Sequence, residues 1–225
     1  MNSPVLHAYP DRDSCVAALA AELGERLRLA LQEGGQARLL LPGGQSPLPL
    51  LRRLAGQALD WSRIELSPSD ERWVAADVPA SNLQLLRSSL PQARLLDPRQ
   101  AADAAAAARL WGERLAGWLP LTAVLLGMGE DGHIASLFPG MPGLAAALAA
   151  DAAPAALLGV APVEPRQRLT PNLALLLRSD WLGLLAFGAA KRELLDAQLA
   201  GRGGELPVGA LARQAGARLR IYWAP

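Results

Sequence analysis

Short apolar runs alternate with helical patterns about five times along the chain, and this alternation limits the folds that it can adopt. The apolar runs have the length of buried strands and cover residues 37–41, 64–69, 121–126, 155–160, 181–187 and 219–223. Helical patterns lie between them, at 14–31, from 47 onward, at 81–90, at 99–118 and after 188. The pattern is typical of a mostly parallel sheet with helices on both faces. We therefore predict a Rossmann-like α/β fold, with residues 1–225 as a single domain.

Capping residues indicate where the helices begin. Serine and threonine side chains accept hydrogen bonds from the free amides of a helix N-terminus, and proline fits the first turn. We expect Ser14, Ser46 and Ser81 to cap helices, and Thr170-Pro171 to begin another. Residues before Ser14 show no clear pattern, so we expect a loose N-terminus there.

Composition and charge narrow the class of protein. With 225 residues, 51% of them hydrophobic, the chain can bury a sizeable core. Lys plus Arg number 22 and Asp plus Glu 21, and the net charge of +1 argues against a nucleic-acid-binding protein. No apolar run reaches the ~18 residues of a membrane span, no signal peptide is evident, and the single cysteine, Cys15, fits a reducing compartment. We expect a cytoplasmic protein without a membrane or nucleic-acid partner, as a monomer or a small homo-oligomer.

The apolar run 121–126 leads directly into a loop that combines glycine with ionisable side chains. Residues 127–133 read GMGEDGH and include Asp131 and His133. Glycine permits positive φ and close backbone approach to a ligand, and open parallel sheets bind ligands at the carboxyl ends of their strands. Histidine exchanges a proton near neutral pH, and the one other histidine, His7, lies in the N-terminal stretch. A tight turn with an acidic cap is the alternative interpretation, but His133 favours a functional site.

Two further places favour an anionic ligand. Gly43 and Gly44 lie between a predicted strand and a predicted helix, where backbone amides and the helix dipole attract anions. Lys191 falls in the first turn of a predicted helix, where a positive charge is unfavourable with the dipole and so suggests an anionic partner. Short glycine turns and solvated lysines are common, so neither feature is specific by itself.

These features are expected to converge, because the carboxyl ends of parallel strands meet at one edge of a sheet. The predicted site contains Gly43, Gly44, Ser46, Arg72, His133, Arg168 and Lys191. Backbone amides, arginine and lysine together satisfy the oxygens of a phosphate, and a histidine beside them can act as a base. The sequence has no metal-ligand cluster, no GxGxxG dinucleotide loop and no P-loop lysine motif, and we expect neither a metal nor a cofactor.

The residues of this site carry a resemblance to a known family. LGMGEDGHIASLFPG at 126–140 resembles the most specific signature of the 6-phosphogluconolactonase family, which shares its fold with glucosamine-6-phosphate deaminases. Weaker matches lie at Arg168-Leu169-Thr170 and at 188–191, and the resemblance extends from about residue 39 to residue 191. A second signature is matched by Asp70-Glu71-Arg72 with Val74, Asp77, Ser81 and Asn82.

The glycine loop departs from the family pattern. The family usually has serine where Pro42 stands and a hydroxyl residue where Gln45 stands, whereas Ser46 is retained. This departure puts side-chain phosphate contacts at residues 42 and 45 in doubt, while contacts from the backbone amides are unaffected.

The resemblance implies hydrolysis of 6-phospho-D-glucono-1,5-lactone to 6-phosphogluconate, the second step of the oxidative pentose phosphate pathway. A lactone carbonyl is already electrophilic, so a general base that activates water suffices. His133 would be that base, and Asp131 would orient its ring or favour the imidazolium. The implied substrate-binding residues are Gly43, Gly44, Ser46, Asp70, Arg72, Arg168 and Lys191. The glycine-loop amides and Arg72 remain alternatives for stabilising the oxyanion.

Two other functions fit parts of the same pattern. A glucosamine-6-phosphate deaminase and isomerase would use the same phosphate pocket with Asp70 as base. That family has a glutamate-bearing segment after the histidine, and residues 135–139 offer no carboxylate. A non-catalytic sugar-phosphate sensor would be expected to lack the histidine, which is present at 133.

Overall fold

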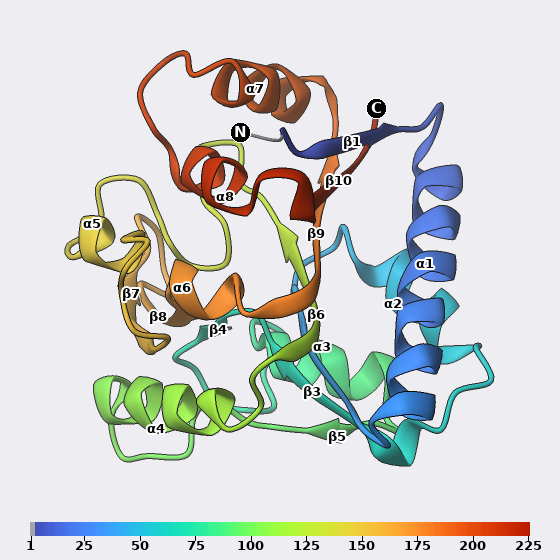
Figure 1. The fold of residues 1–225 in the computed structure, drawn as a ribbon. Helices are drawn as coiled ribbons and strands as arrows, with labels where there is room; N and C mark the ends of the chain where they lie inside the picture. The colour runs from blue at the N-terminus through green and yellow to red at the C-terminus, as the bar shows by residue number, and fades with distance from the viewer. Residues whose placement is uncertain (1–2) are drawn as a thin grey trace.

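The computed structural model describes residues 3–225 and is built around a sheet of seven strands (Figure 1). The spatial order is β1-β10-β9-β6-β2-β3-β5, and every neighbouring pair is parallel. The predicted fold class is therefore confirmed, and the runs 37–41, 64–69, 121–126, 181–187 and 219–223 form strands of this sheet. The strands are β1 (Val5–Ala8), β2 (Ala37–Leu41), β3 (Ile64–Pro68), β5 (Arg94–Leu95), β6 (Leu121–Gly127), β9 (Ser179–Phe187) and β10 (Leu219–Ala224).

Helices cover both faces of the sheet because successive strand residues point to opposite sides. Leu39 and Leu41 of β2 pack in one core, beneath α1, α2 and α3, whereas Leu40 packs in the other, with α4, α6, α7 and α8. Figure 1 shows α1 and α2 on one side of the sheet and α4, α6 and α8 on the other. The helices are α1 (Arg12–Glu33), α2 (Leu48–Ala55), α3 (Asn82–Ser89), α4 (Ala104–Ala116), α5 (Leu144–Ala147), α6 (Leu173–Leu176), α7 (Ala189–Leu199) and α8 (Pro207–Ala215).

A second, antiparallel sheet was not predicted. It has the order β4-β8-β7, with β4 at Glu71–Arg72, β8 at Gln167–Pro171 and β7 at Ala156–Val160. The run 155–160 is thus a strand, but it lies outside the parallel sheet. Thr170-Pro171 was predicted to begin a helix and instead ends β8, where the Thr170 hydroxyl accepts a hydrogen bond from the backbone of Ser136. The following short helix, α6, is capped by Asn172.

The structure agrees with one of four other predicted helix starts. Ser81 caps α3 as predicted, because its side chain accepts from the amide of Gln84. The cap of α1 is Asp11 and not Ser14, whose own amide donates to Asp11 at 2.7 Å. Ser46 is not a cap, since α2 begins at Leu48 without any side-chain cap. The helix predicted at 99–118 is shorter, because α4 begins after the cap residue Asp103.

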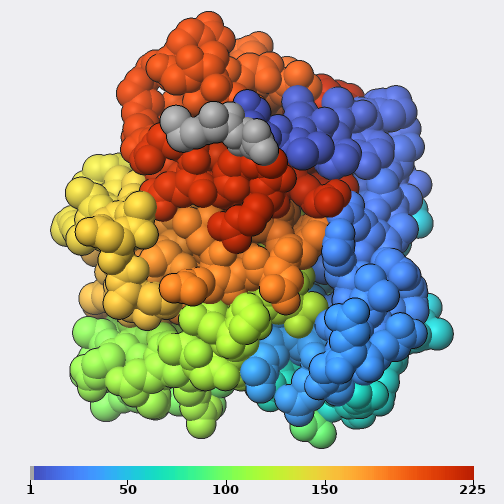
Figure 2. All heavy atoms as spheres, viewed as in Figure 1, coloured from blue at the N-terminus to red at the C-terminus, as the bar shows by residue number. Residues whose placement is uncertain are grey.

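The N-terminal stretch is ordered into the sheet, contrary to prediction. Residues 5–8 form β1, which pairs in parallel with β10 and places His7 beside Tyr222. The two rings stack with their centroids 5.1 Å apart. Figure 2 shows the first and last described segments, blue and red, side by side on the surface. Helix α8 was not predicted either.

The parallel sheet fixes where a site can form. The chain leaves β2, β3, β6 and β9 at the same edge, and the loops that follow therefore meet. Among the helices of the described chain, none is long and apolar enough to cross a bilayer.

Candidate active site

One cavity of about 290 Å³ lies where the loops after β2, β3 and β6 meet β8 and α7. The glycine loop at 42–47 forms one wall, and residues 69–72 and 127–138 form others. The structure brings together eight of the nine residues predicted for the site; Asp131, the ninth, reaches the cavity only through His133. The lining residues that were predicted are Gly43, Gly44, Ser46, Asp70, Arg72, His133, Arg168 and Lys191.

His133 and Asp131 form a closely coupled pair. The imidazole Nδ1 lies 2.6 Å from Asp131 Oδ1, and the His133 amide donates to the same oxygen at 3.2 Å. A carboxylate accepts hydrogen bonds, so Nδ1 carries the proton in the neutral ring and Nε2 is left as an acceptor. Phe138 packs beside the ring, with the centroids 4.4 Å apart. The ring therefore has one free basic nitrogen in a fixed orientation.

The glycines of this loop act in different ways. Gly132 has a φ of 80°, a left-handed conformation that side chains disfavour. Gly129 is outside that region, but a Cβ atom there would lie 2.2 Å from His133 Nδ1 and 2.5 Å from Asp131 Oδ1. Positive φ or close approach to a ligand was the predicted reason for these glycines, and Gly129 instead makes room for the histidine–aspartate pair.

Two cations face the cavity, Arg168, which is buried, and Lys191, which is half-buried. Arg168 is only 7% exposed, and its buried Nε has no hydrogen-bond partner within residues 3–225. Burial lowers the pKa of Arg168, and the nearby charge of Arg72, its cross-strand neighbour, acts in the same direction. Burial likewise lowers the pKa of Lys191, although Glu130 opposes the change. Both groups are thus positive charges with reduced solvation, which an anion in the cavity would stabilise.

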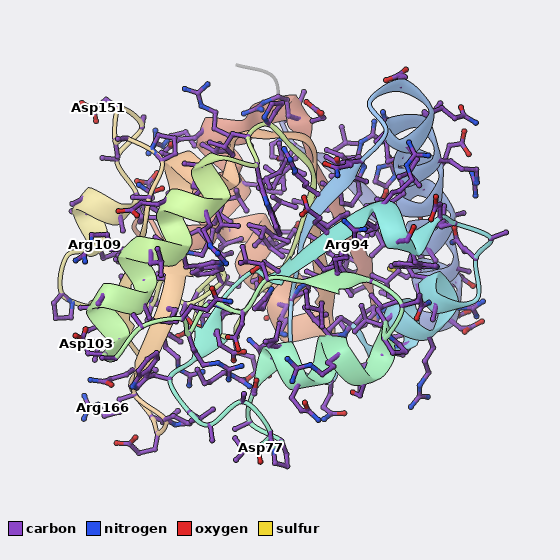
Figure 3. All side chains as sticks on the ribbon, turned by 90° about the horizontal axis from the view of Figure 1, so that it is seen from below. Asp77, Arg94, Asp103, Arg109, Asp151 and Arg166 are labelled. Carbon is purple, nitrogen blue, oxygen red and sulfur yellow. The ribbon has the colours of Figure 1, made fainter. Side chains whose placement is uncertain are left out.

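Two charged residues near the site in sequence, Asp77 of the second signature and Arg166, do not reach the cavity. Figure 3 shows Asp77 and Arg166 pointing outward from the molecule, and both are exposed. Arg166 is two residues before the buried Arg168, so the two arginines offer a natural comparison.

Ser136, Asn82 and Ala135 also line the cavity, although none of them was predicted as a site residue. Ser136 is fully buried and its hydroxyl donates to Asp70 Oδ2. Asn82 had been noted as a signature match only, and its side chain donates to the main-chain oxygen of Asp70 at 2.8 Å. Ala135 has a φ of 47°, which is uncommon for a residue other than glycine. These contacts join segments far apart in the chain, so no local pattern signals them.

The described part of the chain contains no cluster of side chains that is typical of a metal-binding site. Within residues 3–225, no group of three or more His, Cys, Asp or Glu side chains is placed to hold one.

Comparison with known proteins gives a consistent result. The family model described as "Glucosamine-6-phosphate isomerases/6-phosphogluconolactonase" matches residues 10–223. A 6-phosphogluconolactonase of Pseudomonas putida is 38% identical over 227 residues, covering 98% of this chain and 93% of the relative. One from Pseudomonas aeruginosa is 42% identical over 215 residues, covering 92% and 89%. The crystal structure of a 6-phosphogluconolactonase from Shewanella baltica superposes with a TM-score of 0.89 at 28% identity, covering 99% and 98%. The chain therefore belongs to the family of glucosamine-6-phosphate isomerases and 6-phosphogluconolactonases.

Proposed function

We propose that the protein hydrolyses 6-phospho-D-glucono-1,5-lactone to 6-phosphogluconate, with His133 as the general base, in the oxidative pentose phosphate pathway. The names of its relatives support an enzyme of the 6-phosphogluconolactonase kind. The observation that carries the mechanism is the pairing of His133 Nδ1 with Asp131 at the wall of a cavity that also holds Arg168 and Lys191. The direct test is whether the purified protein accelerates the decay of freshly generated lactone above its spontaneous rate.

The proposed reaction needs one base and no covalent intermediate. Water gives a proton to His133 Nε2 while its oxygen attacks C1 of the lactone. The bond between C1 and the ring oxygen then breaks, and the imidazolium returns the proton to that oxygen, which becomes the C5 hydroxyl. Asp131 keeps the ring oriented and stabilises the imidazolium. Arg72 or the amides of the glycine loop stabilise the oxyanion.

The phosphate is assigned to the cationic part of the cavity. Arg168 has a buried donor without a partner in the described chain, and an anion that accepts from it would remove the cost of that burial. The backbone of the glycine loop lines the same cavity and is the other proposed source of donors. The N-terminus of α2 adds little, because Pro47 and Pro49 carry no N–H and the Leu48 amide donates to the Gln45 carbonyl.

Removing either cation should weaken binding of the phosphorylated substrate in particular. We expect Arg168→Ala and Lys191→Ala each to raise KM strongly, because charge-assisted contacts are worth ~1.5–3 kcal/mol. Activity on non-phosphorylated gluconolactone should change much less. Arg166→Ala is the matched control, since that side chain points outward. An equal loss with both substrates would show that the residue is structural or catalytic.

Gln45 should contribute little through its side chain, although it lines the cavity. The backbone amides of the glycine loop serve a phosphate whatever the side chain at 45. Gln45→Ser is therefore expected to keep near-normal kcat/KM in steady-state assays. A loss of kcat/KM beyond about tenfold, ~1.4 kcal/mol, would show that the side-chain amide of Gln45 contacts the substrate.

Glucosamine-6-phosphate deamination is the alternative activity, and the Asp70 carboxylate in the same cavity favours it. Residues 135–139 supply no carboxylate beside His133, which favours the lactonase. Ammonia release from glucosamine 6-phosphate distinguishes the two, and binding of sugar phosphates without either activity would indicate a sensor.

A further inference from the structure

Asn82 lies in the wall of the cavity, yet the proposed mechanism gives it no part. It is the first residue of α3 and is 3% exposed. Its backbone amide donates at 2.8 Å to Glu71, a fully buried carboxylate that lies 3.7 Å from Arg99 Nη1. The side chain of Asn82 therefore extends from a rigid point.

The side-chain amide of Asn82 can face in only one direction. Its Nδ2 donates at 2.8 Å to the main-chain oxygen of Asp70 and lies 3.4 Å from Asp70 Oδ1. Both atoms are acceptors, so the NH₂ group must face Asp70 and Oδ1 must face away. Gly43 lies on that other side: a Cβ there would be 1.9 Å from Oδ1 and 2.2 Å from Cγ of Asn82. Because φ of Gly43 is not left-handed, it is the space filled by Asn82 that requires glycine at 43.

Asp70 is held from its other side by Ser136. The Ser136 hydroxyl donates to Asp70 Oδ2, and Ser136 belongs to the loop that carries His133. Asn82 thus lies between the glycine loop after β2 and Asp70 after β3, and Ser136 joins Asp70 to the loop after β6.

We propose that Asn82 is a positioning residue whose amide sets the spacing between the glycine loop and Asp70, and so the width of the substrate cavity at this wall. The inference rests on the proposed function, in which the glycine loop binds the phosphosugar in the cavity that Asp70 also lines. Capping of α3 does not require this side chain, because Ser81 and the Glu71 carboxylate accept from the first amides of the helix.

Removing the amide should loosen the cavity without unfolding the protein. We expect Asn82→Ala to lower kcat/KM about tenfold, while the melting temperature falls only by the few degrees that the loss of one buried hydrogen bond costs. Asn82→Asp should be worse, because it sets a carboxylate against two acceptor oxygens of Asp70. Gln84→Ala is the control, because it removes a side-chain amide from the same helix at a position that does not line the cavity. It should change neither kcat/KM nor the melting temperature.

A rescue experiment tests the spacing itself. Gly43→Ala places a methyl group against the amide, and Asn82→Ala removes that amide, so the double variant should be more active than Gly43→Ala alone. The proposal would be overturned if the fold-loss of kcat/KM in the double variant equalled the product of the losses in the two single variants. Wild-type activity in Asn82→Ala would overturn it as well. A wild-type protein without lactonase activity would instead contradict the proposed function. The spacing would then be tested by melting temperatures, and we expect a lower melting temperature in Gly43→Ala than in the double variant.

Discussion

Replacing His133 with alanine is expected to lower kcat for 6-phosphogluconolactone by ~10²–10⁴, the usual contribution of a general base. KM and thermal stability should change little, because Arg168, Lys191 and the glycine loop remain in place. Steady-state kinetics, corrected for spontaneous hydrolysis, and a thermal melt measure these quantities. His7→Ala is the matched control, since the only other histidine of the chain lies in β1 and does not line the cavity.

His133→Asn separates a catalytic role from a structural one. If His133 mainly stabilised its loop, stability would fall and asparagine would rescue better than alanine. If it is the base, both variants lose kcat alike. A folded His133→Ala protein that keeps more than about a tenth of wild-type kcat, against the 10²-fold minimum for a lost base, would remove His133 from the mechanism. Asp70 or Asp131 would then be the next candidate.

The pH profile provides an independent measurement on the same variants. The imidazole accepts a proton from water only when it is neutral, so kcat/KM of the wild type should fall on acidification. The residual activity of His133→Ala should lack this acid limb.

The strands that end at the cavity were the most predictable part of the fold. Residues 37–41 and 121–126 are nearly continuous apolar runs because the parallel strands are covered on both faces. The glycine or charged residues that follow mark each strand's end, and parallel topology alone then brings those ends together. This is why the predicted site residues converge in one cavity although no contact between them was visible in the sequence.

What the sequence could not show depends on contacts between distant segments. The Thr170 hydroxyl looks like a helix cap, but it accepts from Ser136, which is 34 positions away. β1 is short and of mixed character, and its pairing partner lies at the other end of the chain. The roles of Gly43 and Gly129 are of the same kind, since each makes room for a side chain from elsewhere in the fold or the loop.

Gly129→Ala is expected to lower kcat about 10²-fold, close to the minimum for loss of the general base. A Cβ atom 2.2 Å from His133 Nδ1 and 2.5 Å from Asp131 Oδ1 is closer than non-bonded atoms approach, so the pair must move or separate. KM should change little because the cationic end of the cavity is untouched. Since φ of Gly129 is not left-handed, alanine adds no backbone strain of its own, and the fold should persist.

Histidine NMR measures the displacement separately from catalysis. The chain has two histidines, so ¹⁵N spectra of the imidazoles resolve His133 from His7. The wild type should show the Nδ1-protonated tautomer of His133, fixed by the bond to Asp131, and Gly129→Ala should lose that preference. Gly56→Ala is the matched control, because a Cβ at this helix end meets no atom closer than 3.7 Å and the residue has a φ of −81°. Wild-type kcat and an unchanged tautomer in Gly129→Ala would contradict this prediction. They would show that the loop accommodates a methyl group and that the His133–Asp131 pair does not need glycine at position 129.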